Sequence, residues 1–340
     1  MCLSSQIPDL EWESSAEKVV VALWDSYCDA RFVEVTLRPH GGKVRLWELR
    51  ESVERHMRAE CQTRMNMRVL WKEPGAETWT SAPLRVFYCD KHIAGEAEQF
   101  LDLNFLSTVE WKPLPPPGES ETLSFYERTT GIDVTPTFQV WYRNSVGEVC
   151  SAVLRGTTSL TSADRVMDIG FDVASLTSRL EDVSELLSLT VRVGERTMPY
   201  YRTQPAPNAS FLFLNCFNVP EWARLICSTT TKTNDERKLG RVGRRRVLYN
   251  PSREVLHEVQ TAALEMDHAE WIDQLITSPG VWLADGTAVV ITDGECAVSD
   301  DNGTLNSVKF TWQRNDSRAG MSVVERVDRI FTKEFTYQFT

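Results

Sequence analysis

Apolar and polar residues alternate over many short stretches of the chain, which is the pattern of half-buried strands. In the first third, the alternation predicts strands over residues 19–24, 32–38, 65–71 and 84–89. Four apolar residues between these strands recur at spacings of three and four and predict a helix over 46–60. They are Leu46, Leu49, Val53 and Met57. With a shorter helix expected at 95–105, residues 1–111 are predicted to form a β-rich domain with two connecting helices.

A proline-rich stretch follows this first domain. Residues 112–118 read Lys-Pro-Leu-Pro-Pro-Pro-Gly, which predicts an extended segment with few hydrogen bonds and is typical of a linker. Beyond it, strands are predicted at 122–127, 137–143, 148–154 and 166–173, then a short helix at 174–187 and a hairpin of 187–193 with 196–202. This spacing of strands and turns is typical of a β-sandwich. We therefore predict an Ig-like sandwich domain over residues 119–205.

The remaining residues, 208–340, again read mostly as strands. A Thr/Ser run at 228–233 is typical of an edge strand, and further strands are predicted at 246–250, 254–262, 287–292, 295–299, 304–313 and 330–339, with a hairpin turn at Asn302-Gly303. One helix is predicted at about 267–277, with Asp267 as N-cap and Pro279-Gly280 as its stop. We expect a β-barrel or β-sandwich assembly domain with one helix. The fold class predicted for the whole chain is mainly β, with sandwich-like or barrel-like modules and a few short helices packed on the sheets.

Charge adds one sharp feature to this picture. The 340 residues include 37 Lys and Arg against 48 Asp and Glu, a net charge of −11 that argues against a dedicated nucleic-acid binder. Residues 237–253 nevertheless carry seven basic residues and no acid, so the rest of the chain carries −18 (−11 − 7). Two interpretations stay open for this segment: a basic arm that docks on an acidic surface of a neighbouring subunit or on nucleic acid, or a solvated hairpin with its tip at 240–243. Of the two docking partners a protein is favoured, because DNA repels an acidic protein. The candidate interface residues are Arg241, Arg244, Arg245 and Arg246, together with Trp222 near a strand edge.

The sequence contains none of the motifs that would indicate a catalytic or metal site. The chain has no Gly-x-Ser-x-Gly elbow, no phosphate-binding glycine loop and no His or Cys at metal-ligand spacing. We expect no catalytic residues, no metal and no cofactor, although a carboxylate pair assembled by folding would leave no spacing signal. The eight cysteines are dispersed and are expected to be reduced, buried thiols. No stretch approaches the ~20 apolar residues of a membrane span, and the first residues lack a signal-peptide pattern, so we expect a soluble protein made in the cytoplasm.

Several C-terminal stretches resemble uncharacterised tail or baseplate structural proteins of phages and prophages of Bacteroides-type gut bacteria. They are Asn-Cys-Phe-Asn-Val-Pro-Glu at 215–221, the segment 259–275, Ile-Thr-Asp-Gly-Glu-Cys-Ala-Val-Ser at 291–299, and 305–312. The resemblance covers mainly residues 210–340, with a weaker likeness over the first 110. It implies a non-enzymatic homo-oligomer with ring assembly that contacts other tail proteins, is made in the bacterial cytoplasm and ends in the virion.

Two other functional classes stay open beside this one. The first is a carbohydrate-binding or protein-binding β-sandwich protein, in which exposed Trp rings stack on sugars; the eleven Trp residues of the chain keep it open. The second is a hydrolase whose carboxylate pair comes from distant segments. Neither nucleic acid nor membrane is expected as a partner.

Overall fold

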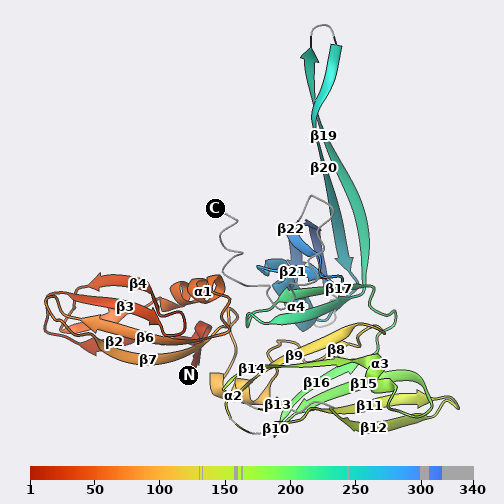
Figure 1. The fold of residues 1–340 in the computed structure, drawn as a ribbon, viewed down its shortest axis with the longest axis horizontal. Coiled ribbons are helices and arrows are strands. Elements are labelled where there is room, and N and C mark those ends of the chain that lie inside the picture. Colours follow the sequence, from red (N-terminus) through yellow and green to blue (C-terminus); the bar gives the residue numbers. More distant parts are fainter. Residues whose placement is uncertain are drawn as a thin grey trace.

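The structure is a computed structural model that describes residues 1–315 except 130, 132, 157–159, 162–163, 243–244 and 299–305; side chains are not described at 133, 160–161 and 235–253. The described part is mainly β, as predicted, with four α-helices. No sheet combines strands from more than one of the segments 2–87, 112–201 and 209–314. We call these segments the N-terminal, central and C-terminal units (Figure 1). The domain boundaries predicted above stay a prediction.

The N-terminal unit is a five-stranded sheet of order β1-β7-β6-β3-β4 with a short pair β2-β5 and helix α1. The first strands are β1 (Cys2–Leu3), β2 (Leu10–Glu13), β3 (Val19–Asp25), β4 (Ala30–Leu37) and β5 (Lys43–Leu46). They are followed by α1 (Leu49–Ala59), β6 (Arg64–Lys72), β7 (Thr80–Phe87) and α2 (Ala97–Leu103), and a 3-10 turn lies at Ser4–Gln6. The predicted apolar stripe of α1 is confirmed for Leu49, Val53 and Met57, which are buried. The helix begins later than the predicted residue 46, and Leu46 lies in β5 instead.

The central unit has two main sheets that enclose one core. One has the order β12-β11-β15-β16-β8 and the other pairs β14 with β9; their apolar side chains pack in a single cluster. The strands are β8 (Lys112–Pro113), β9 (Ser120–Glu127), β10 (Asp133–Val134), β11 (Thr137–Asn144), β12 (Val149–Arg155), β13 (Leu160–Thr161), β14 (Arg165–Asp172), β15 (Val183–Val193) and β16 (Arg196–Tyr201). Two sheets that share a core form the layered arrangement that the alternation predicted.

Two predictions for this region need correction. The helix expected at 174–187 is only one short turn, α3 (Val173–Thr177), capped by Asp172, and the residues from Val183 onward join β15. The proline-rich segment is extended, but it is not an exposed spacer: Lys112 pairs with Tyr200 of β16, and Lys112 and Leu114 are buried. Proline at the edge of a sheet loses no ladder hydrogen bond, which explains how this segment can border a sheet.

The C-terminal unit is a seven-stranded sheet of order β18-β17-β21-β22-β23-β20-β19 with one helix, α4. Its elements are β17 (Ala209–Leu214), β18 (Pro220–Leu225), β19 (Cys227–Val242), β20 (Arg245–Thr261), α4 (Met266–Thr277), β21 (Val281–Leu283), β22 (Ala288–Ala297) and β23 (Ser307–Arg314). Helix α4 packs on β22 and β23 and buries Trp271. Among the described strands this sheet is open, with β18 and β19 at its edges, rather than a closed barrel.

Element boundaries in this unit differ from the predicted ones in three places. The strands expected at 246–250 and 254–262 are one strand, β20, and those expected at 287–292 and 295–299 are one strand, β22. Helix α4 begins after Glu265, so Asp267 lies in its first turn instead of capping it. The strand expected at 330–339 and the Asn302-Gly303 turn lie outside the described residues.

Candidate functional site

A long arm projects from the C-terminal unit (Figure 1). It is the hairpin of β19 and β20, which pair antiparallel from Cys227 with Thr261 at the base to Val242 with Arg245 near the tip. Strand β20 also pairs with β23, but only over 257–260. Beyond that point the two arm strands pair only with each other among the described strands. At about 3.4 Å per residue, 232–242 reach roughly 35 Å away from the sheet.

The base of the arm is fixed by side chains. The His257 ring stacks on Trp312 with ring centroids 4.0 Å apart, and its Nδ1 lies 3.1 Å from Thr231 Oγ1. Burial, with a smaller contribution from Arg314, lowers the pKa of His257 and so favours the neutral ring. An ion pair of 2.5 Å joins Lys232 Nζ to Glu258 Oε1. The arm therefore leaves the sheet from a packed platform.

Most of the predicted interface residues lie near the tip of this arm. Arg241 pairs in register with Arg246, and Arg245 pairs with Val242; Arg244 lies outside the described residues. Like charges directly across a strand pair are destabilising when no counter-charge is near, and 237–253 contain no acid. The tip therefore concentrates positive charge for which its own segment has no counter-charge.

Trp222, the other predicted interface residue, lies elsewhere. It is half-buried on β18, the edge strand opposite β19, and the Arg224 guanidinium lies over its ring at 5.5 Å from the centroid. The structure thus does not bring Trp222 together with the arm. Its contact with Arg224 places it beside the junction of the units.

All three units meet in one buried junction, which sequence reasoning did not find. Its apolar part comprises Leu3, Phe87, Cys89, Ala97, Leu101, Leu106, Tyr126, Cys216, Phe217 and Val219. Phe100 stacks on Phe217 with centroids 5.5 Å apart, and the Asn218 side chain donates to the carbonyl of Gln62 at 3.2 Å. Apolar burial across the three units favours one arrangement of them.

An ionic cluster next to this apolar part joins the central unit to the C-terminal unit. Its members are Lys112, Glu119, Glu121, Glu221 and Arg224. Lys112 Nζ lies 2.8 Å from Glu221 Oε1 and 3.8 Å from Glu121 Oε1, and Arg224 binds Glu121 and, at 3.3 Å, Glu119. The side chains of all except Glu119 are at most 4% exposed. Two buried cations therefore face two buried carboxylates, which is the balance that a buried charge requires.

Neutral groups add hydrogen bonds to Glu221 and Arg224 in this cluster. Ser107 Oγ donates to Glu221 Oε1 at 2.5 Å, and Asn215 Nδ2 donates to Glu221 Oε2 at 2.6 Å. The Arg224 guanidinium also donates to the carbonyl of Ser120 at 2.8 Å. Satisfied hydrogen bonds reduce the cost of burying these charges and fix their geometry.

Glu121 and Glu221 form a carboxylate pair from distant segments, the arrangement that the hydrolase alternative requires. Both are held by Lys112, and the space beside Glu221 and Lys112 is too small for a water molecule. A glycosidase-type pair instead flanks an open space that admits the sugar. In this structure the pair serves as a buried connection between two units.

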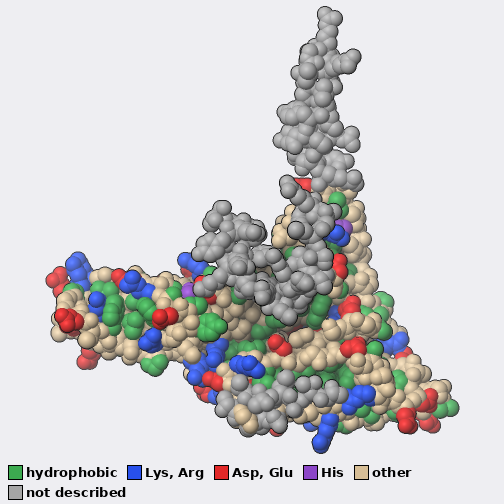
Figure 2. Space-filling model, in the orientation of Figure 1, with side chains coloured by type: hydrophobic (Ala, Val, Ile, Leu, Met, Phe, Trp, Pro, Cys, Tyr) green, Lys and Arg blue, Asp and Glu red, His purple; other side chains and the backbone are tan. Residues whose placement is uncertain are grey.

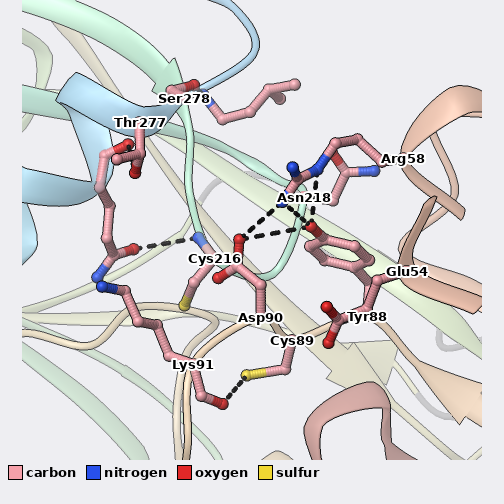
Figure 3. A network of polar contacts seen from close by, with 12 residues as sticks. Glu54, Arg58, Tyr88, Cys89, Asp90, Lys91, Cys216, Asn218, Thr277 and Ser278 are labelled. Atoms are coloured by element: carbon pink, nitrogen blue, oxygen red, sulfur yellow. Dashed lines mark hydrogen bonds and ion pairs between the residues drawn. The ribbon is translucent and has the colours of Figure 1, made fainter. Parts of the chain in front are cut away.

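A polar cavity lies where the N-terminal unit meets the C-terminal unit (Figure 3). Its volume is about 20 Å³, room for one water. On one wall, Arg58 donates to Tyr88 Oη at 2.6 Å and to Asp90 Oδ2 at 3.0 Å. Burial is the main cause that raises the pKa of Asp90 and that of Tyr88, the latter to about 12. A cavity of this size holds a solvent molecule and excludes an organic substrate.

A Cys, His and Asp also come together in the N-terminal unit. Asp25 is fully buried and lies 3.0 Å from His56 Nε2, while Gln62 Nε2 donates to Asp25 at 2.7 Å and contacts Cys28 Sγ at 3.2 Å. Burial and the nearby Asp25 raise the pKa of Cys28 to about 11. A nucleophilic cysteine needs a lowered pKa. The group therefore has the properties of a structural hydrogen-bond cluster.

The cysteine prediction is correct in part. All eight cysteines are free thiols, but only Cys89, Cys216 and Cys227 are buried, and the other five are half-buried. Within the described ranges, no group of three or more His, Cys, Asp or Glu residues is arranged to hold a metal ion. The described helices are all too short or too polar to cross a membrane.

Exposed aromatic rings mark the outer face of the five-stranded central sheet. Trp141 is 42% exposed and Tyr201 48% exposed. Both pair in register with Ser188 of β15, so the three residues lie in one row on the same face. Elsewhere on the visible surface of the first two units, basic and acidic side chains are interspersed (Figure 2).

Comparisons with known proteins do not assign the chain to a class. No protein-family model matches the sequence, and no curated protein matches it.

Proposed function

We propose that this protein is a non-enzymatic structural component that assembles through its arm, with a second copy of itself and neighbouring structural proteins as partners. The observation that carries the proposal is the arm: a two-stranded ribbon about 35 Å long that ends in a basic segment without acids. The rest of the chain carries −18. A second copy therefore offers the arm an oppositely charged surface.

The energetics of a two-stranded ribbon support an assembly role. An isolated hairpin is only marginally stable in water, because it has no third strand and no packed face. Residues 228–234 and Glu254 in the described part of the arm are exposed. A partner that packs against the ribbon would order it and neutralise the opposed Arg241 and Arg246 positions.

The setting we propose is a phage or prophage tail or baseplate. Mainly β units, buried connections between them and a reaching arm agree with the resemblance of residues 210–340 to such proteins. On this proposal the chain is made in the bacterial cytoplasm and ends in the virion. The arm would contact the next subunit, and the junction would hold the three units at fixed angles.

Charge reversal at the tip tests the proposal. The variant R244E/R245E/R246E should lower the self-association constant by at least about tenfold, equivalent to about 1.4 kcal/mol, in sedimentation velocity. Raising the ionic strength should weaken assembly of the unaltered protein in the same direction, because exposed charges are screened by salt.

The matched control is K18E/R38E/R192E, which reverses three exposed basic residues far from the arm in sequence. It changes the net charge by the same amount, so it separates a local effect from one of total charge. Equal assembly of the tip variant and the unaltered protein would overturn the proposal. Equal weakening by both variants would show that net charge alone is responsible and would also contradict it.

A second function is favoured by the row Trp141, Ser188 and Tyr201. Two exposed rings separated by one strand provide apolar platforms with a hydroxyl between them, a surface suited to stacking against sugar rings. We propose carbohydrate binding at this face as the alternative. Glycan-array binding that W141A abolishes, while W222A retains it, would support this function; an array with no binding would reject it.

A further inference from the structure

Two thiols from different units lie next to each other in the junction. Cys89 follows β7 of the N-terminal unit and Cys216 follows β17 of the C-terminal unit, and both belong to the same buried apolar cluster. The Cys89 thiol itself donates to the carbonyl of Lys91 at 3.2 Å. Figure 3 shows both sulfur atoms in the same part of the junction, beside Lys91. These residues are more than 100 positions apart in the sequence, so their contact is a product of the tertiary fold.

Backbone contacts hold this pair in place. The Asp90 amide donates to the Cys216 carbonyl at 3.1 Å, which joins the two segments directly beside the thiols. Ser4 Oγ accepts from the Cys89 amide at 2.9 Å, and Gln274 Oε1 accepts from the Cys216 amide at 3.1 Å. A disulfide requires its two Cα atoms to be within about 7 Å of each other. Neighbouring main chains fixed in this way favour closure with little backbone movement.

The protonation of the two thiols and the space beside them also bear on their oxidation. The neighbouring thiol is the main cause that lowers the pKa of Cys89, whereas the same contact raises the pKa of Cys216. The two thiols therefore influence each other's protonation across the boundary between the units. Cys216 also lines the polar cavity of about 20 Å³, so a water-sized molecule has room beside it.

We propose that Cys89 and Cys216 form a disulfide when the protein meets hydrogen peroxide, and that this bond ties the N-terminal unit covalently to the C-terminal unit. The two thiols give up two protons and two electrons as the S–S bond forms. The peroxide O–O bond breaks, and peroxide takes up both protons and both electrons to give two molecules of water. The inference is independent of the proposed assembly function.

The test is a cysteine map of the full-length chain. Reduced protein is treated with hydrogen peroxide, alkylated under denaturing conditions, digested and analysed by mass spectrometry. We expect a linked peptide pair containing Cys89 and Cys216 as the main oxidation product, with both residues alkylated in the untreated sample. The Tm of the oxidised protein should rise above that of the reduced protein, because a long loop is closed in the unfolded chain.

Two variants make the test specific. C216S should remove both the linked peptide and the oxidant-dependent rise in Tm, whereas C150S, at a half-buried site on β12, should retain both. Thermal unfolding of reduced C216S reports whether that variant folds, and the map of the unaltered protein needs no variant. A folded, oxidised protein in which Cys89 and Cys216 stay reduced, or become sulfinic acids without a linked peptide, would overturn the proposal.

Discussion

The arm and the junction differ in how their charged residues are balanced. In the junction, Lys112 and Arg224 are buried against Glu121 and Glu221, and each charge has a counter-charge within the chain. In the arm, seven basic residues at 237–253 have no acid in their own segment. The charges of the junction are therefore balanced within the chain, whereas segment 237–253 at the end of the arm has no acid of its own.

Packing shows the same difference. The junction collects buried side chains from all three units, whereas the outer arm is a ribbon whose strands pair only with each other among the described strands. Stability should therefore depend on the junction, and assembly should depend on the arm. Changes that affect one and spare the other test this division.

The largest expected effect comes from removing one buried charge of the junction. Arg224→Met leaves Glu121 without its guanidinium partner, so the free energy of unfolding should fall by about 3–5 kcal/mol. Urea or guanidinium denaturation measures this loss. The matched control is Arg143→Met, which breaks a pair with Glu185 that is 43% and 31% exposed and should cost at most about 1 kcal/mol. Equal losses of unfolding free energy for the two variants would show that burial of the cluster does not increase its contribution to stability.

A smaller effect is expected from Asp90 at the polar cavity. Burial raises its pKa in the folded state above the unfolded value of about 3.9, so the folded protein binds a proton more tightly than the unfolded chain. Its contribution to stability is thus fully present below pH 3.9 and is lost as the pH rises through the folded pKa.

Asp90→Asn should remove the loss of stability that the ionisation of Asp90 causes as the pH rises. The slope of unfolding free energy against pH should become less negative above about pH 4, and the change at pH 7 should stay within about 1 kcal/mol. Chemical denaturation across pH 3–7 measures the slope. Asp9→Asn at an exposed position is the control. An unchanged slope in Asp90→Asn would show that burial of this carboxyl has no energetic consequence.

The smallest effect on stability is expected from shortening the arm. Replacing residues 235–253 with an Asn-Gly turn joins Asn234 to Glu254, which already pair in register. The free energy of unfolding should change by less than about 0.5 kcal/mol, since the removed strands pair with no other described strand. A loss of several kcal/mol in denaturation would show that the arm folds back to support the body and would contradict the division proposed here.

Local patterns were sufficient to predict most elements of the body. The helix predicted at 267–277 is α4, which begins one residue earlier, and the hairpin predicted from 187–193 and 196–202 is formed by β15 and β16. The arm was harder to predict. Two strands were predicted, at 246–250 and 254–262, whereas in the structure β20 continues through 251–253 and has an irregular register opposite Lys238.

No pattern in the sequence indicates the junction. Lys112 and Glu221, like Glu121 and Arg224, are about 100 positions apart, and isolated charged residues are usually solvated. The composition of the proline-rich segment was misleading. It is typical of a linker, whereas Lys112 and Leu114 are buried in the structure. The predicted tip residues Arg241, Arg245 and Arg246 were found near one another in register because their separation in sequence is short, and hairpins are local.

The most direct test of the central claim is sedimentation velocity of the full-length protein beside the arm-shortened variant. The account predicts that the full-length protein sediments as an oligomer at micromolar concentration, and that the variant lacking 235–253 sediments as a folded monomer. A full-length protein that remains monomeric, or a shortened variant that assembles equally well, would contradict it.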